Sequence, residues 1–317
     1  MNILIASPID PTALERLRAE HDVKCAFGAE QCAFQSAVRD REVIVFRSGV
    51  TISSAVMQSA PRLELLVRAG SGCDNVDLEY VKRRGLRLVR VPQPAAKAVA
   101  ELAFAQMLVL ARNLLAADRS MRQGEWRKGE LTGFLLTGKV LGIVGAGNIG
   151  SRVGQLGAAW GMEVLGCVEF PSAAVSRELA EKGICLAGLD EVLRRADFLS
   201  LHVPLQDSTR YLINAEALAR MKQGAFLVNT SRGGIVDEEA LRHALQSGHL
   251  RGAALDVHER EGEGKLSPLA SLPNVLLSPH IGSSTVDTQR EIGQRILDII
   301  NQYVADRTRG ITARAAS

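Results

Sequence analysis

The chain has 317 residues, of which 46% are apolar and 23% charged, and its 38 basic and 35 acidic side chains leave a net charge of +3. This balance is typical of a soluble globular protein long enough for two domains. So small and evenly spread a charge does not indicate nucleic acid or a membrane as a partner. The five cysteines form no CxxC pair, which favours reduced thiols in the cytoplasm over disulfides or a metal site.

Short apolar runs that read as strands alternate with helical patterns along the chain. Before residue 92 the runs at 2–6, 43–46, 63–67 and 86–91 predict strands, and Pro11 begins a predicted helix. Pro92 and Pro94 then interrupt the chain, and one long helix is expected over about 97–122. Its apolar part, 98–111, looks too short and too polar to span a bilayer, because Glu101 and Gln106 interrupt it.

A second series of strands follows that helix. The expected strands are at 139–144, 163–168, 198–201, 226–229, 253–257 and 275–277, and a last helix over about 285–303 precedes a polar tail expected to be frayed. The alternation predicts an α/β fold with two Rossmann-like, doubly wound parallel-sheet domains and a cleft between them. We expect a discontinuous substrate domain, residues 1–97 plus 285–317, and a dinucleotide-binding domain, residues 98–284.

A glycine motif follows the first strand of the second series. In LGIVGAGNIG, Gly145 permits a tight turn, Gly147 lets a pyrophosphate approach the backbone, and Gly150 allows close packing of helix on sheet. The N–H groups of Asn148 and Ile149 then face an anion at a helix N-terminus. The sequence therefore predicts a dinucleotide cofactor.

The acid expected to bond the adenosine ribose is displaced in this chain. Glu169, 19 residues after Gly150, is the nearest candidate, and it follows Val168. No arginine occurs before Arg177, so a pocket for a 2′-phosphate is not evident. NAD is favoured over NADP.

Seven sequence blocks resemble the D-isomer-specific 2-hydroxyacid dehydrogenase family, and above all its phosphoglycerate dehydrogenases and hydroxypyruvate/glyoxylate reductases. They are VRAGSGCDNVDLE (67–79), AVAELAFAQMLVLAR (98–112), GIVGAGNIG (142–150), LHVPL (201–205), LVNTSRGGIVDEEAL (227–241), AALDVHEREG (253–262) and LLSPHIGSST (276–285). The resemblance implies hydride transfer between a nicotinamide cofactor and a 2-hydroxy or 2-oxo acid.

Three ionisable residues match the roles that this reaction needs. A guanidinium suits a carboxylate, and the resemblance implies that Arg232 holds the substrate carboxylate and polarises the carbonyl. Histidine suits proton transfer near neutral pH, and His280 stands where the family has its acid/base. Glu261 would orient His280 and favour its charged form, although Gly262 follows where relatives carry proline.

The resemblance also implies further contacts. Those expected with the cofactor are at His202, Val203, Pro204, Thr230, Ser231, Asp256, Gly282 and Ser283, with Asp256 on the nicotinamide carboxamide. Those expected with the substrate are the backbone of Arg68, Ala69, Gly70, Ser71 and Gly72, together with Arg47. Arg47 and Lys128 could serve a phosphorylated substrate, and no metal is expected. Where many relatives carry asparagine, this chain has Ala95.

The sequence leaves the substrate open between a hydroxypyruvate or glyoxylate type of acid and 3-phosphoglycerate. The family also implies a homodimer formed through the 98–122 helix and the loop after it. An alternative from another class is an NADH-sensing corepressor on the same fold, because such proteins keep the same three residues.

Overall fold

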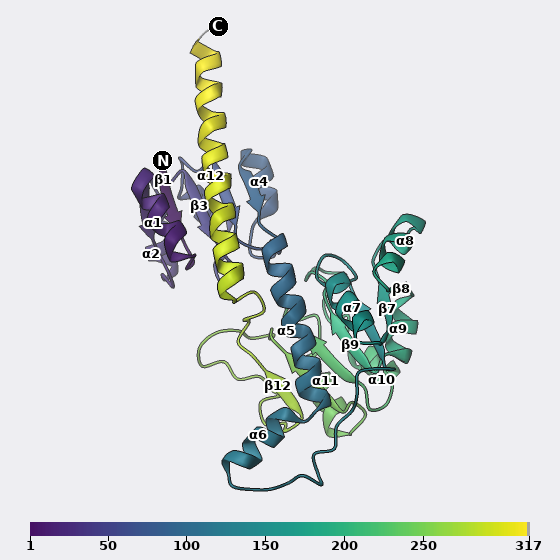
Figure 1. The fold of residues 1–317 in the computed structure, drawn as a ribbon. Coiled ribbons are helices and arrows are strands. Elements are labelled where there is room, and N and C mark those ends of the chain that lie inside the picture. The colour runs from purple at the N-terminus through teal and green to yellow at the C-terminus, as the bar shows by residue number, and fades with distance from the viewer. Residues whose placement is uncertain (316–317) are drawn as a thin grey trace. The chain divides into compact units, whose positions relative to one another are not determined.

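The computed structural model describes residues 1–315 and divides the chain into two compact units. Unit 1 comprises residues 1–95 and 283–317, and unit 2 comprises residues 96–282. The sequence placed the two boundaries two residues further along the chain. Figure 1 follows the chain from the N-terminal elements through unit 2 and back to unit 1 by the last helix.

Unit 1 is built on a parallel sheet of five strands in the order β2-β1-β3-β4-β5. The strands are β1 (Asn2–Ile5), β2 (Asp22–Cys25), β3 (Val43–Phe46), β4 (Leu65–Arg68) and β5 (Arg87–Arg90). The connecting helices are α1 (Pro11–Glu20), α2 (Gln31–Ala37), α3 (Ser54–Gln58) and α4 (Leu78–Arg84). Because strand side chains alternate between faces, Ile3 and Ile5 enter one apolar core while Leu4 enters the core on the other face.

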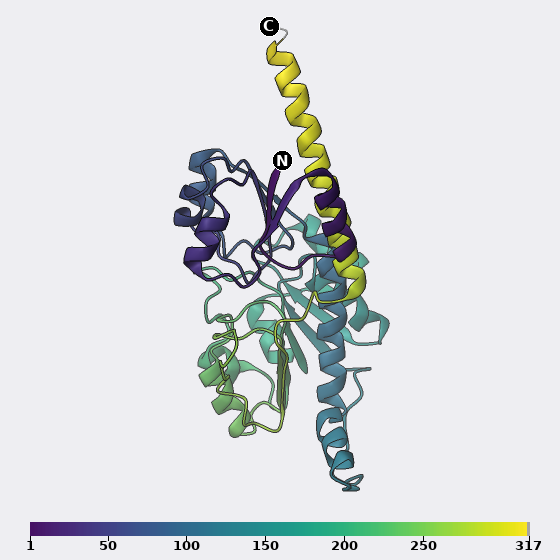
Figure 2. The same cartoon turned by 90° about the vertical axis from the view of Figure 1, so that its left-hand side faces the viewer.

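The last helix, α12 (Val286–Ala315), belongs to unit 1 and covers the face of the sheet that carries Ile3 and Ile5. Its buried residues Ile292, Ile296 and Ile300 recur at helical spacing and pack in that core. Figure 2 shows α12 passing α1, and Gly293 makes the close approach possible, since an added Cβ would lie 2.8 Å from the Cβ of Asp10.

Unit 2 is built on a parallel sheet of seven strands in the order β12-β11-β10-β9-β6-β7-β8. The strands are β6 (Val140–Val144), β7 (Glu163–Cys167), β8 (Cys185–Leu186), β9 (Phe198–Leu201), β10 (Phe226–Asn229), β11 (Gly252–Leu255) and β12 (Val275–Leu277). The helices are α5 (Gln93–Ala111), which begins in unit 1, α6 (Leu114–Arg122), α7 (Gly150–Ala159), α8 (Ala173–Glu181), α9 (Leu189–Arg195), α10 (Ala215–Arg220) and α11 (Glu238–Gln246). The strand order reverses between β6 and β9, which is where doubly wound sheets bind ligands.

The expected α/β class is confirmed, and several expected elements are corrected. The helix expected over 97–122 is two helices, because Asn113 takes a left-handed conformation with φ of +52°. The sheet of unit 2 has a seventh strand, β8, that the sequence did not indicate. The segment after Ala305, expected to be frayed, continues α12 to Ala315.

Helix α5 is also more apolar than the sequence suggested. At 19 residues and a mean hydropathy of 1.4 it is long and apolar enough to cross a membrane, contrary to our expectation for 98–111. However, 67% of its most apolar stretch is buried inside the structure, as in a core helix. Phe104 and Met107 pack in the core of unit 2 with Leu141 and Ile143 of β6.

Candidate active site

The glycine loop after β6 has the geometry that a dinucleotide needs. Gly145 has φ of +93°, and a Cβ there would lie 2.7 Å from the His202 carbonyl oxygen. A Cβ on Gly150 would lie 2.2 Å from the Gly145 carbonyl oxygen, so only glycine allows α7 to start here. A Cβ on Gly147 would meet no atom within 4 Å, so its open face is available to a pyrophosphate. Among residues 1–315 no backbone partner is described for the N–H groups of Asn148 and Ile149.

A crevice of about 820 Å³ extends from this loop across the carboxyl ends of β6, β7 and β9. Six of the residues expected to bind the cofactor line it: Gly145, Gly147, Glu169, His202, Val203 and Pro204. Glu169 is exposed and lies in the loop two residues beyond the end of β7. The volume of the crevice is large enough for an adenosine moiety, and Glu169 is the acid that lines it beside the glycine loop and β7.

His202 lines the crevice as a neutral side chain. Burial lowers the pKa of His202 to about 3, so its imidazole carries no charge at physiological pH. Its Nε2 lies 2.8 Å from the Ser200 hydroxyl, while its buried Nδ1 has no partner within the described residues. A buried nitrogen of this kind fits a ligand that supplies a hydrogen bond.

Arg232 lies in a braced turn at the carboxyl end of β10, here called the arginine loop (residues 230–234). Asn229, which is 1% exposed, accepts hydrogen bonds from the backbone N–H and the hydroxyl of Ser231, at 3.0 and 2.6 Å. Its Nδ2 donates to the Arg232 carbonyl oxygen at 3.0 Å. The Arg232 guanidinium donates to the Ser231 carbonyl at 2.7 Å. The side chain of Asn229, at the end of β10, therefore fixes the backbone of this turn.

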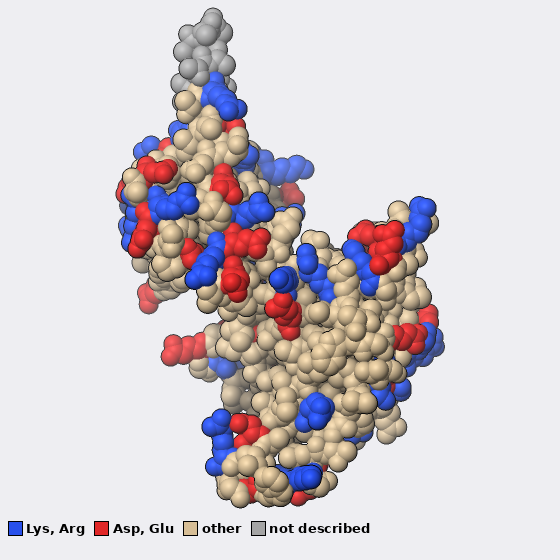
Figure 3. All heavy atoms as spheres, in the orientation of Figure 1, with Lys and Arg blue, Asp and Glu red and all other residues tan. Residues whose placement is uncertain are grey.

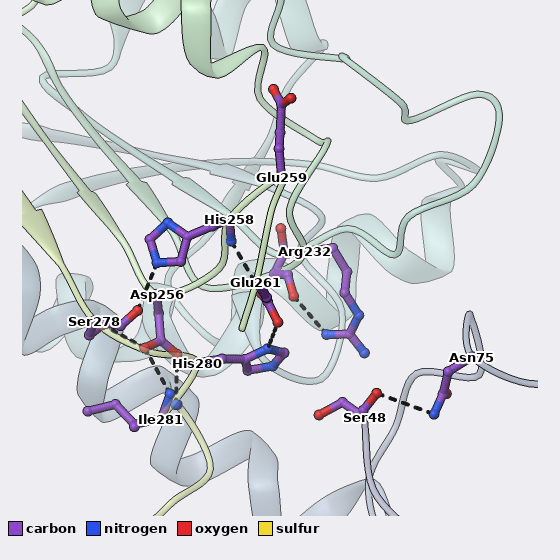
Figure 4. Close-up of polar contacts among 12 residues, drawn as sticks. Ser48, Asn75, Arg232, Asp256, His258, Glu259, Glu261, Ser278, His280 and Ile281 are labelled. Atoms are coloured by element: carbon purple, nitrogen blue, oxygen red, sulfur yellow. Dashed lines mark hydrogen bonds and ion pairs between the residues drawn. The ribbon is translucent and has the colours of Figure 1, made fainter. Parts of the chain in front are cut away.

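His280 and Glu261 form a hydrogen-bonded pair, as the sequence expected. The Nδ1 of His280 lies 2.9 Å from Glu261 Oε2 (Figure 4). Burial alone would raise the pKa of Glu261, but hydrogen bonds from His280 and from the His258 backbone N–H outweigh it and lower that pKa. Glu261 is therefore ionised at neutral pH and fixes the tautomer of His280. For the Nε2 of His280 no partner is described in residues 1–315, which leaves this atom for a substrate.

His280 is held in a left-handed conformation, with φ of +54°, that a non-glycine residue rarely adopts. Asp256 holds the turn: its carbonyl accepts from the His280 N–H at 2.8 Å, and its carboxylate accepts from the Ile281 and Gly282 N–H groups at 2.9 and 2.7 Å. The Ser278 hydroxyl adds a bond to the same carboxylate at 2.6 Å. Strain at one residue, fixed by its surroundings, is typical of active sites.

The role expected for Asp256, a contact with the nicotinamide carboxamide, stays a prediction. Its side chain is fully buried, and its carboxylate accepts three hydrogen bonds from the 278–282 turn. Thr230, Ser231 and Gly282 lie at the ends of β10 and β12 and do not line the crevice. Ser283 falls in unit 1.

The arginine loop touches the loop that carries Glu261, here called the glutamate loop (residues 256–267). An added Cβ on Gly233 would lie 1.8 Å from the carbonyl oxygen of His258 and 2.9 Å from the Glu259 nitrogen. The two backbones are therefore in contact at Gly233. The His258 ring in turn bonds the Ser278 carbonyl at 2.9 Å, which links the glutamate loop to the His280 turn (Figure 4).

In the loop at residues 68–72 of unit 1, which was expected to bind the substrate through its backbone, two of the N–H groups already have protein partners. The N–H groups of Ala69 and Gly70 donate to Phe46 and Arg68 carbonyls, at 2.9 and 2.8 Å, so they are not open to a substrate. The Arg68 guanidinium is buried and donates to the carbonyls of Gly72 and Ala69, so it supports the loop from within. For the N–H groups of Ser71 and Gly72 no backbone partner is described in residues 1–315.

Arg47 and Lys128, the cations considered for a phosphate, differ in their surroundings. The guanidinium of Arg47 donates to the Ser283 hydroxyl at 3.0 Å, and burial lowers its pKa. Lys128 is exposed in the segment between α6 and β6. On the face shown in Figure 3, cationic and anionic side chains are interspersed.

The sequence did not identify four residues whose side chains bond the loops of this site: Asn229, His258 and Ser278, described above, and Glu238, whose carboxylate accepts from the Glu259 N–H at 2.7 Å. Asn229 carried a usable signal, because asparagine at a strand end often braces a turn with its side chain. The contacts of the other three depend on which loops meet in space. No cluster of three metal-ligating side chains occurs within the part of the chain that the structure describes.

Comparison with known proteins gives a consistent result. Residues 104–282 match the D-isomer specific 2-hydroxyacid dehydrogenase, NAD binding domain. The chain is 38% identical over 306 residues to D-3-phosphoglycerate dehydrogenase of Methanocaldococcus jannaschii, covering 96% of this chain and 57% of the relative. It is 36% identical over 299 residues to hydroxypyruvate reductase of Thermotoga maritima, covering 93% and 96%.

Solved structures agree with these matches. The crystal structure of D-lactate dehydrogenase from Aquifex aeolicus, complexed with NAD and lactic acid, has a TM-score of 0.87 and 30% identity over 98% of each chain. A glyoxylate reductase from Paecilomyes thermophila has a TM-score of 0.84 and 29% identity over 94% of each chain. The chain spans little more than half the length of the phosphoglycerate dehydrogenases that it matches.

Proposed function

The chain belongs to the D-isomer specific 2-hydroxyacid dehydrogenase family, and from this premise we propose that it interconverts a D-2-hydroxy acid and its 2-oxo acid with NAD. The observation that carries the proposal is the pair of His280 and Glu261, 2.9 Å apart, with the second imidazole nitrogen unpartnered among the described residues. It lies on the same sheet edge as the glycine loop and Arg232.

The residues of the site divide the reaction between them. When bound, reduced nicotinamide supplies a hydride to the carbonyl carbon, and the carbonyl electron pair moves onto oxygen. The Nε2 of His280 gives that oxygen a proton, and Glu261 stabilises the imidazolium that holds this proton before transfer. Arg232 binds the substrate carboxylate through its planar fork and so fixes the carbonyl beside His280. The reverse reaction uses His280 as the base.

For the cofactor we propose NAD rather than NADP. Glu169 lies in the crevice next to Val168 and Pro171, where its carboxylate can accept hydrogen bonds from a ribose diol. The same negative charge would repel a 2′-phosphate. No lysine or arginine is among the residues that line the crevice in the described part of the chain.

For the substrate we propose a small 2-oxo acid of the hydroxypyruvate or glyoxylate type, with the phosphorylated acid of the phosphoglycerate reaction as the second candidate. The guanidinium of Arg47 donates to a neutral partner, the Ser283 hydroxyl, in unit 1 and has further donors. A phosphorylated substrate would need this cation, whereas a small acid would not, so the comparison of the two acids below decides between the candidates.

The proposal is tested by following NADH absorbance with hydroxypyruvate, glyoxylate, pyruvate and phosphohydroxypyruvate. We expect turnover that His280→Ala lowers by about 10²–10⁴-fold, because a general acid is lost, with NADH affinity unchanged. The matched control is His243→Ala, since His243 is an exposed residue of α11. Tight NADH binding without turnover of any acid would contradict the proposal and favour a sensor of the cofactor.

We further propose that the protein is a cytoplasmic homodimer. Support for the dimer comes from large apolar side chains exposed on α6 and the segment after it: Leu114, Leu115, Met121, Trp126 and Leu135. Exposed apolar patches of this kind are typical of interfaces. Sedimentation should give twice the chain mass for wild type and the monomer mass for Leu114→Glu with Met121→Glu; a monomeric wild type would contradict the dimer.

Support for the cytoplasm comes from five free thiols.

A further inference from the structure

The glutamate loop is long and irregular, yet it must hold Glu261 within hydrogen-bond distance of His280. No helix or strand is assigned between β11, which ends at Leu255, and β12, which begins at Val275. Gly262 and Gly264 lie within it with φ of +122° and +73°, and the residues from Glu261 to Leu266 are exposed. A loop of this composition needs an anchor if one of its side chains is to be fixed.

Glu238, the first residue of α11, supplies such an anchor on both sides of Glu261. One carboxylate oxygen accepts from the backbone N–H of Glu259 at 2.7 Å, and the other accepts from the Ser267 hydroxyl at 2.9 Å. The Glu238 side chain is 3% exposed, so these bonds are shielded from water. Glu261 lies between the two anchored residues.

The contact with Glu259 is reciprocal. The carboxylate of Glu259 accepts from the Glu238 N–H at 3.0 Å, and this N–H is one of the groups that a helix leaves without an internal partner. The Tyr211 hydroxyl adds a bond to the second oxygen of Glu259 at 3.4 Å. The N-terminus of α11 favours negative charge, which explains how two carboxylates are accommodated together. In Figure 4 Glu259 points away from His280, so it anchors the loop and does not compete with Glu261.

We propose that Glu238 is a positioning residue for proton transfer, acting through the glutamate loop on Glu261 and His280. This inference rests on the proposed function. Glu238 follows the arginine loop in the chain, and Gly233 of that loop contacts the His258 and Glu259 backbone. The hydrogen bonds of Glu238 with Glu259 and Ser267 are here called the clamp. The clamp holds the carboxylate of Glu261 and the arginine loop in one arrangement.

The test compares Glu238→Ala, Glu238→Gln and Glu239→Ala. A glutamine amide can still accept from the Glu259 N–H and can donate to the Ser267 oxygen, so it should retain the clamp, whereas alanine removes it. Glu239 is the control because it is exposed and paired with Arg242. We expect Glu238→Ala to lower kcat at least tenfold with the NADH dissociation constant within twofold of wild type. The high-pH limb of kcat should move to lower pH. Glu238→Gln should stay within threefold of wild type in kcat.

Hydrogen exchange gives a readout that does not depend on turnover. The hydrogen-bonded amides of His258 and Glu259 should exchange at least tenfold faster in Glu238→Ala, with β10 and β11 unchanged. If wild type reduces no acid, the proposed function fails and this measurement still decides whether the clamp exists. Unchanged exchange, or a loosened loop with normal kcat and pH profile, would overturn the inference.

Ser267→Ala tests the same clamp if the Glu238→Ala variant does not fold. It removes only one bond to Glu238 and should give a smaller change of the same kind in both measurements. A Ser267→Ala variant identical to wild type in exchange and in kcat would also count against the clamp.

Discussion

Replacing Gly233 with alanine would separate the arginine loop from the glutamate loop. The added Cβ would lie 1.8 Å from the His258 carbonyl oxygen and 2.3 Å from its carbon, against an ordinary contact of at least 3.4 Å. The two backbones must therefore move apart by about 1.6 Å, the difference between 3.4 and 1.8 Å. Neither backbone can rotate out of the way as a flexible side chain would.

A displacement of this size acts on the relative positions of Arg232 and His280. Misplacement by about 1 Å of a group that orients a substrate can cost about 10²-fold in rate, so we expect kcat/KM to fall about 100-fold. Overpacking should also cost about 1–3 kcal/mol of stability, measurable by urea unfolding. The control is Gly129→Ala, because a Cβ there meets nothing within 4 Å. A folded Gly233→Ala enzyme with wild-type kcat/KM would show that the contact does not position the site.

Three further changes test other parts of the structure. Gly147→Val should leave the melting temperature unchanged, since its Cβ meets no protein atom, but weaken NADH binding at least 100-fold; equal affinity by fluorescence titration would refute the pyrophosphate argument. Arg232→Lys should raise KM for the 2-oxo acid and lower kcat, because the two-pronged bond is lost, and wild-type kinetics would place the carboxylate elsewhere. Arg307→Ala should lower the free energy of unfolding by about 1 kcal/mol at pH 7, because Arg307 bonds the buried Glu42 at 2.8 Å. The control is Arg295→Ala, since Arg295 is exposed on the same helix. Burial alone would raise the pKa of Glu42, but the hydrogen bonds from Arg307 and the Asn2 N–H lower that pKa overall. The ion pair therefore stabilises the fold above pH 4.5, and this stabilisation disappears as the pH falls below that value. An equal loss of unfolding free energy in Arg307→Ala at pH 3 and at pH 7 would contradict the ion pair.

The parts of the fold that depend on local pattern could be predicted from the sequence. The central strands β3, β4, β9 and β10 are buried along their whole length and read as plain apolar runs. The edge strand β2 is partly exposed along its four residues, and the edge strand β8 has only two residues, so neither sequence carries such a run. Their pairing is decided by the neighbouring strand.

Long-range contacts explain the other differences. Helix α12 continues past Ala305 while Arg307 bonds Glu42 and Tyr303 bonds Glu64, partners more than 230 positions away in the sequence. The break at Asn113 had a local signal, since asparagine tolerates the left-handed conformation, but it lies between apolar residues that end at Ala111 and resume at Leu114, which together read as one helix. For the site, the motifs identified His280 and Glu261 as partners, whereas the burial of Asp256 could be seen only once the 278–282 turn was folded over it.

The order of strands in unit 2 gives a reason why the cofactor is a dinucleotide and not a single nucleotide. Glu169 follows β7, and the glutamate loop follows β11, which lies four strands away through β6, β9 and β10. Neighbouring strands are about 4.8 Å apart, so the two positions are about 19 Å apart along the sheet edge. A mononucleotide held at Glu169 could not reach His280. A ligand with its linking phosphates at Gly147 and one base on each side of the glycine loop would reach from Glu169 to the glutamate loop. The strand order therefore fits a cofactor whose adenosine half and reactive half lie on opposite sides of the switch point.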